Sequence, residues 1–304
     1  MRSHMNRPSA VIVLLLGLTI FWFAACQSPN SASEPNQGIP MVPTPTVAPT
    51  APPPIQSPPS TNRNLALGNP SDAAHNINDP DNYLIERPQY VLSYNRDRGI
   101  PNWVSWQVTK QDLGTTPRSP TFTSDTSLPK SWYHVTLDDY TGSGYDRGHM
   151  CPSADRTATA IDNAATFILT NVLPQAPDNN RSTWEHLESF SRTLVGKGHV
   201  LDIIAGGDGT IGTIANGHVA VPRYTWKIIV VLPKGATSST QITAATPVIA
   251  VRIPNGLKNK LGDWDQYRVP VATIEKATGY HFFGNLTAKI QQALKTQVAP
   301  IPTN

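Results

Sequence analysis

The sequence predicts an α+β fold with a mixed or antiparallel central sheet, in one domain that spans residues 64–304. Strand-like and helix-like segments do not alternate strictly along the chain, which disfavours a parallel sheet built from strand–helix–strand units. From about Leu65 onward, aromatic and β-branched residues reach the density of globular proteins. A stretch of about 240 residues suits a single domain with a sizeable core.

The first half of this domain predicts strands joined by short turns. Residues 88–94 and 103–108 alternate between apolar and polar side chains, as half-buried strands do. The segment between them, residues 95–99, is rich in turn-forming residues. Another short strand is expected at residues 133–137, followed by a glycine-rich loop at residues 142–144.

The clearest element of the second half is a helix over residues 180–195. Trp184, Leu187, Phe190 and Leu194 recur in it at helical spacing, which predicts a buried apolar stripe. The other expected elements are helices at residues 157–166 and 271–277 and strands at residues 167–169, 199–204, 224–232 and 248–253. Residues 206–209 lack the Lys-Ser/Thr of a phosphate loop and are expected to form a turn.

The N-terminal 26 residues predict an export signal of the lipoprotein type. Arg2 and Arg7 precede an apolar run over residues 11–25, and Phe23-Ala24-Ala25-Cys26 resembles a lipobox. Cys26 is therefore expected to be acylated, which would attach an exported protein to a membrane at its periplasmic or extracellular side. An ordinary signal peptide is the alternative, and a transmembrane helix is disfavoured because the run is shorter than the ~20 residues that a bilayer needs.

Residues 27–63 predict a spacer between this anchor and the domain. They consist mainly of Pro, Ser, Thr, Ala and Gln, and Glu34 is the only charge before Arg63. Such a segment cannot bury enough apolar surface to offset its ordering entropy. At ~3.1 Å per residue it could hold a domain up to roughly 100 Å from a membrane.

The charge of the domain limits how it could bind phosphate, and the cysteine content excludes two kinds of structural site. The formal charge is +3, but the residues after 63 are close to neutral, so a phosphate-binding surface would have to be a local basic patch. The candidates for that patch are Arg118, Arg147, Arg156, Arg181 and Arg192. With only Cys26 and Cys151 in the chain, neither a disulfide scaffold nor a cysteine zinc set is available, and Cys151 is expected to be a buried small hydrophobe.

The segment Tyr145–Met150, read together with the helix at residues 180–195, indicates phosphodiester chemistry. That reaction needs an activated water and charge neutralisation on the phosphoryl and departing oxygens. His149 can act as the base, with activity rising through the histidine pH range and a nearby cation such as Arg147 moving that rise downward. Asn180 can supply one oxygen to a hydrated Mg²⁺, although a helix cap is the alternative interpretation. Glu188 can hold a water of the metal, and Arg192 can pair with Glu188 or reach a phosphate; a surface ion pair is the alternative.

Two segments resemble the motifs of a known family. The string DRGH in GSGYDRGHMCPSADRT and the segment LTNVLPQAPDNNRSTWEHLE are similar to those of the DNA/RNA non-specific endonucleases, the endonuclease G-like branch of the ββα-metal nucleases. The resemblance covers residues 65–290 or so. It implies a ββα-metal catalytic motif and hydrolysis of DNA and RNA to 5′-phosphate ends, with Mg²⁺ or, as an alternative, Mn²⁺.

The same resemblance implies roles for single residues. Asp146 corresponds to a structural or metal-shell carboxylate, Arg147 to a phosphate or transition-state contact, and Arg118 to a substrate-binding arginine. Asn171 and Gln175 correspond to polar residues that support the substrate site. The expected partners are DNA and RNA, a membrane through the lipid anchor and a protein inhibitor. Two alternatives remain open, namely an envelope-anchored module that binds nucleic acid without cleaving it and a phosphodiesterase for small esters.

Overall fold

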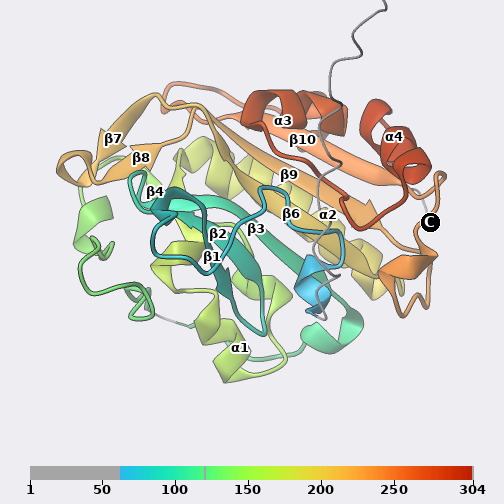
Figure 1. The fold of residues 1–304 in the computed structure, drawn as a ribbon, viewed down its shortest axis with the longest axis horizontal. Helices are drawn as coiled ribbons and strands as arrows, with labels where there is room; N and C mark the ends of the chain where they lie inside the picture. Colours follow the sequence, from blue (N-terminus) through green and yellow to red (C-terminus); the bar gives the residue numbers. More distant parts are fainter. Residues whose placement is uncertain (1–61, 120, 303–304) are drawn as a thin grey trace, which may run out of the picture. The chain divides into compact units, whose positions relative to one another are not determined.

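The central element of the protein is a six-stranded sheet in which every neighbouring pair is antiparallel. The structure is a computed structural model that describes residues 62–119 and 121–302, so the predicted signal and nearly all of the spacer lie outside the described residues. The strand order is β1 (Tyr83–Glu86), β2 (Val91–Asn95), β3 (Ile100–Val108), β6 (Leu201–Asp208), β9 (Tyr224–Val231) and β10 (Val248–Pro254) (Figure 1). The predicted α+β class with an antiparallel sheet is confirmed.

Helices cover both faces of this sheet. On one face α2 packs over a core that includes Ile229 and Val231 of β9, and on the other α3 and α4 pack over Ile228 and Val230 (Figure 1). Neighbouring side chains of a strand point to opposite faces, so a strand covered on both sides becomes a nearly continuous apolar run. The α-helices are α1 (Ala160–Ala165), α2 (Trp184–Gly196), α3 (Val271–Thr278) and α4 (Ala288–Thr296). None of the helices in the described part of the chain is long and apolar enough to cross a membrane.

Two small antiparallel sheets lie beside the central one. One pairs β7 (Gly212–Ile214) with β8 (Val219–Val221), and the other pairs β4 (Asp146–His149) with β5 (Val172–Gln175). The chain leaves β5 through a π-helical turn at Asn179–Thr183 and continues directly into α2. Strands β4 and β5 followed by α2 therefore form a ββα unit, as the resemblance implies.

Three sequence predictions about secondary structure were wrong or incomplete. Residues 133–137 form no strand, because the amide of Thr136 donates to the carboxylate of Asp139 and not to a neighbouring strand. The turn expected at residues 206–209 begins only at Gly209, because β6 continues to Asp208. Gly206 is a glycine for a packing reason, since a Cβ there would come 2.7 Å from the ring of Trp226. Residues 167–169 contribute a single bridge, between Ile168 and Thr123, and the strand itself follows as β5. Strands β1, β4, β7 and β8 and helix α4 were not predicted.

Candidate active site

The DRGH segment is strand β4, and its glycine is required by the packing of β5. Gly148 pairs with Leu173 in the β4–β5 register, and a Cβ on it would come 2.6 Å from the Cβ of Gln175. Gln175 is fully buried, and its amide nitrogen donates to Asn179 Oδ1 at 3.1 Å. The absence of a side chain at residue 148 therefore lets β4 lie close to the beginning of the helix that follows β5.

His149, at the end of β4, lies in an aromatic setting. Its ring is 4.9 Å from the ring of Phe122 and 4.8 Å, edge-on, from that of Phe167, and the residue is 8% exposed. Burial, together with the neighbouring guanidinium of Arg118, lowers the pKa of His149 to about 3. The ring nitrogen Nε2 is buried and has no hydrogen-bond partner among the described residues. The imidazole is therefore neutral near pH 7, which is the form that a general base needs.

Two arginines lie on the phenylalanines that enclose His149. Arg118 stacks on Phe167 with its guanidinium carbon 4.7 Å from the ring centroid, and its Nη1 donates to Ser153 Oγ at 2.7 Å. Arg147 stacks on Phe122 at 5.3 Å and makes no hydrogen bond to the other described residues. Guanidinium groups held in this way keep donors free for the oxygens of a phosphate. The sequence motif suggested Arg147 as the cation that lowers the pKa of His149, but in the structure that cation is Arg118.

Asn180 lies on the π-helical turn and is oriented by Asp146 of β4. Its Nδ2 donates to Asp146 Oδ2 at 2.9 Å, and Arg181 holds the same carboxylate from two nitrogens at 2.7 and 2.5 Å. Burial tends to raise the pKa of Asp146, but the bonds from Arg181 and Asn180 outweigh it and lower that pKa. Because the amide nitrogen is held by an ionised carboxylate, the amide oxygen of Asn180 is the atom left for a ligand.

The donor set fits a hydrated magnesium ion better than a fully protein-bound metal. No group of three or more His, Cys, Asp or Glu side chains that could hold a metal is found in the described part of the chain. Mg²⁺ keeps several waters and needs few protein oxygens, so the single amide oxygen of Asn180 suits it.

Glu188, about one turn into α2, has a partner that its own helix does not indicate. Lys227 of β9 donates to Glu188 Oε1 at 3.1 Å, and the Glu188 side chain is 12% exposed. Burial raises the pKa of Glu188 more than the neighbouring Lys227 lowers it. Arg192 does not pair with Glu188 as predicted, since its Nη1 lies 3.3 Å from Asp155 Oδ1. The one signal for Lys227 in the sequence is its position inside the apolar run of β9, where an unpaired lysine would be unfavourable.

Comparison with known proteins identifies the family. The family model described as DNA/RNA non-specific endonuclease matches residues 68–289. The chain belongs to this family. It is 49% identical over 249 residues to a protein named Nuclease from Nostoc sp. (strain PCC 7120), covering 81% of this chain and 90% of that one. It is 32% identical over 223 residues to human mitochondrial Endonuclease G, covering 68% of this chain and 71% of that one.

A solved structure agrees with this assignment. The fold matches, with a TM-score of 0.63 and 25% identity, a chain from the crystal structure of the EndoG/EndoGI complex, covering 80% of this chain and 100% of that chain. The protein is therefore a nuclease that acts on nucleic acids, from a family that generally depends on a metal ion.

Two polar residues predicted to support the substrate site lie in the interior of this endonuclease. Asn171 is fully buried, and its side chain bonds the amide and the carbonyl of Cys151 at 2.9 and 2.8 Å. Gln175 is also fully buried, beneath Gly148. Both amides therefore fix the strands on either side of His149, and burial keeps them from direct contact with a substrate.

Two members of the predicted basic patch are occupied elsewhere. Arg156 is buried and donates to the backbone carbonyls of Gln89 and Gln107, and Arg192 neutralises Asp155. The patch around the histidine of the endonuclease thus reduces to Arg118 and Arg147, with Arg181 bound to the carboxylate that orients Asn180.

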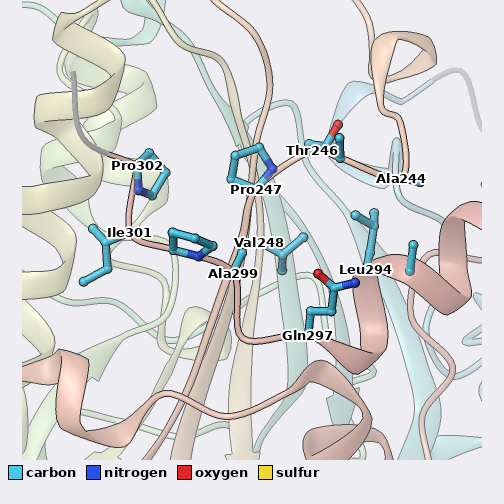
Figure 2. Close-up of a pocket in the computed structure, with 12 residues that line it drawn as sticks. Ala244, Thr246, Pro247, Val248, Leu294, Gln297, Ala299, Ile301 and Pro302 are labelled. Carbon is cyan, nitrogen blue, oxygen red and sulfur yellow. The ribbon is translucent and has the colours of Figure 1, made fainter.

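Two other features are unsuited to the chemistry. Cys151 is fully buried, as predicted, and burial raises the pKa of its thiol to about 12, which excludes a thiolate nucleophile near neutral pH. A cavity of about 360 Å³ lies between residues 244–248, α4 and residues 297–302 (Figure 2). None of the described residues that line this cavity carries an ionisable side chain, so the family's hydrolytic groups lie elsewhere.

Proposed function

We propose that the protein is a sugar-non-specific endonuclease that hydrolyses DNA and RNA to 5′-phosphate ends with Mg²⁺ bound at Asn180. The observation that carries the proposal is a neutral, buried His149 between two phenylalanines that each hold an arginine. A base, two phosphate-binding cations and an oriented amide oxygen are the groups that phosphodiester hydrolysis needs.

In this proposal His149 takes a proton from the attacking water. A general base has to be neutral to accept a proton, and the lowered pKa keeps the imidazole neutral across the physiological range. The negative phosphodiester would lie beside Arg118 and would partly offset the charge by which Arg118 lowers the pKa of His149. Substrate binding would therefore raise that pKa and make the ring a stronger base.

Arg118 and Arg147 bind the phosphate group of the scissile bond. Contacts from guanidinium groups to phosphate oxygens read the backbone and not the bases, which accounts for activity on many sequences. Neither arginine has an ion-pair partner among the described residues, and both retain nitrogens that can donate. These contacts do not distinguish ribose from deoxyribose, in keeping with activity on both DNA and RNA.

Asn180, Asp146 and Glu188 form the metal side of the proposed site. Asp146 fixes the amide of Asn180 so that its oxygen can hold the ion, and Glu188 contributes a carboxylate that can accept hydrogen bonds from the ion's waters. Bound Mg²⁺ would supply charge neutralisation at the phosphoryl oxygens and at the departing 3′ oxygen.

The test is cleavage of a supercoiled plasmid and of a single-stranded RNA, each with Mg²⁺ and with a chelator. We expect both to be cut only with the metal and the ends to carry 5′-phosphates. His149→Ala should bind DNA but cut it 10²–10⁴-fold more slowly, on the order expected for loss of a general base, and added imidazole should restore part of the rate. DNA binding by the wild type without any cleavage would instead support the non-cleaving module, and cleavage of small diesters alone would support the phosphodiesterase.

We also propose that the enzyme is exported and anchored through acylated Cys26, on the strength of the lipobox-like sequence. Mass spectrometry of the native N-terminus tests this, because an unmodified peptide that starts elsewhere would exclude the anchor. We also propose a protein inhibitor as a partner. This is supported by the matching solved structure, which is that of the EndoG/EndoGI complex and concerns the inhibition of EndoG.

A further inference from the structure

Lys227 is a buried cation whose side chain reaches α2, the helix that carries Glu188. It lies in β9, between β6 and β10, opposite Ala205 and Val251, and is 1% exposed. Its ammonium group is 4.1 Å from the ring centroid of Trp184 and 5.7 Å from that of Trp106. Aromatic faces stabilise a cation, but a lysine enclosed in a protein still needs an anionic partner.

Glu188 is that partner, and the neighbouring charges leave no other choice. Asp155, the other carboxylate nearby, accepts a hydrogen bond from the indole of Trp106 at 3.0 Å and pairs with Arg192. The shorter ion pairs are therefore Lys227 with Glu188 and Arg192 with Asp155, and Arg192 also lies 3.9 Å from the exposed Glu185.

The contact fixes one oxygen of Glu188 and leaves the other available. Lys227 bonds Oε1, and no hydrogen bond from the described residues reaches Oε2. Burial lowers the pKa of Arg118 while the charge of Glu188 opposes that change, so the carboxylate acts on the arginine beside His149. Glu188 thus bonds the sheet through Oε1, and its charge acts on Arg118.

Stability alone does not account for a lysine at this position. An apolar side chain of similar length would fill the space between the two tryptophans, and replacing a buried ion pair by apolar residues is often neutral or stabilising. Lys227 is held by hydrogen-bonded strands on both sides, whereas Glu188 is on a helix. The lysine is therefore a fixed point against which the carboxylate can be oriented.

We propose that Lys227 is a positioning residue for catalysis, which holds Glu188 Oε1 so that Oε2 faces the site formed by His149, Arg118 and Asn180. This inference rests on the proposed nuclease function. Lys227 itself touches no reacting group, and its effect on the rate passes through Glu188.

A double-mutant cycle tests the proposal with Lys227→Met, Glu188→Gln and the double variant. Lys227→Met should lower kcat by about 10–100-fold, the loss typical when a supporting partner of a metal site is removed. Glu188→Gln should lower kcat as well, and the double variant should be no slower than Glu188→Gln, because two residues that act through one group are not additive. Lys295→Met is the matched control, since Lys295 forms a Lys–Glu pair with Glu275 at 2.8 Å between α4 and α3. It should retain wild-type kcat.

A second readout does not depend on catalysis. In the metal-free protein, ¹³C NMR of the Glu188 carboxyl should show a higher pKa in Lys227→Met than in the wild type, because the cation at 3.1 Å is gone. The other charges that face Glu188 are those of Asp155, Arg192 and Arg118, with the Cys151 thiol also near, and all remain in the variant.

The outcomes separate the inference from the proposed function. Wild-type kcat in Lys227→Met, or losses that multiply in the double variant, would overturn the positioning role while cleavage by the wild type upheld the nuclease. A wild type that cuts nothing would overturn the proposed function, and an unchanged Glu188 pKa would then overturn the pairing itself. If Lys227→Met does not fold, the double variant, which leaves no buried carboxylate unpaired, is compared with Glu188→Gln, and a slower double variant overturns the role.

Discussion

The proton affinity of His149 gives the most quantitative prediction. An ordinary histidine titrates near 6.5, and burial together with Arg118 lowers the pKa of His149 to about 3. At 1.36 kcal/mol per pH unit, that difference favours the neutral ring by roughly 5 kcal/mol. Protonation in the free enzyme should therefore be negligible above about pH 5, and His149 should not titrate in the range where surface histidines do.

Histidine NMR provides the assay. With ¹³C-labelled histidine and no metal, we expect the His149 ring signal, assigned by its loss in His149→Ala, to stay constant from pH 8 to pH 5. Arg118→Ala should raise the midpoint, since it removes the second cause of the low pKa and leaves burial in place. A His149 midpoint between 6 and 7 in the wild type would refute the reasoning from burial.

The same pKa predicts how activity and stability depend on pH. The value of kcat/KM reports the free enzyme, so it should show no acid limb near pH 6.5 caused by His149. The folded-state pKa lies below the unfolded value of about 6.5, so the unfolded chain binds more protons below that pH. His149 therefore contributes full stability above about pH 6.5, and this contribution falls as the pH drops toward 3. The sequence-based expectation of a rise through the histidine range is thus moved to lower pH.

Other substitutions give further predictions. Asn180→Ala should abolish most metal-dependent cleavage without changing the melting temperature by more than a few degrees, and near-normal rates at low Mg²⁺ would contradict the ligand assignment. Asp146→Ala should raise the Mg²⁺ concentration needed for half-maximal rate by about 10–100-fold, because it frees the Asn180 amide to rotate; an unchanged Mg²⁺ titration would count against it. Arg118→Ala should raise KM more than it alters the Mg²⁺ requirement, and steady-state kinetics would show the reverse if Arg118 acted on the metal. Gly148→Ala should lower the free energy of unfolding by about 1–3 kcal/mol in urea titrations, through its clash with Gln175, and a wild-type midpoint would be inconsistent with that packing.

The elements that the sequence predicted well are those whose pattern is set by burial. Strands β9 and β10 and helices α2 and α3 have apolar runs or stripes that only a covered sheet or an amphipathic helix explains. Strand β4 has no such pattern, since Asp146–His149 is polar along its length. It is a strand because β5, more than 20 residues later, pairs with it, and local propensity carries no information about that partner.

The candidate site was predicted in its parts and not in its connections. His149, Arg118 and Asn180 follow from motif resemblance, but the pairings among charges do not. Spacing on one helix suggested Arg192 as the partner of Glu188, whereas the fold brings Lys227 from another element to Glu188 and Asp155 to Arg192. Such choices depend on which strand passes under the helix, and a single sequence does not contain that information in local form.

The π-helical turn at Asn179–Thr183 has a consequence for engineering. Each residue of an α-helix advances by about 100° around the axis. The extra residue in the π-helical turn therefore rotates the side chains before the turn relative to those of α2 after it. The direction in which the Asn180 side chain points is therefore set by the local widening of the helix. Transplanting the asparagine, the glutamate and their eight-residue spacing onto a regular helix would reproduce the motif but turn the amide of the asparagine away from the carboxylate of Asp146 that orients it. A scaffold that borrows this site has to borrow the widened turn with it.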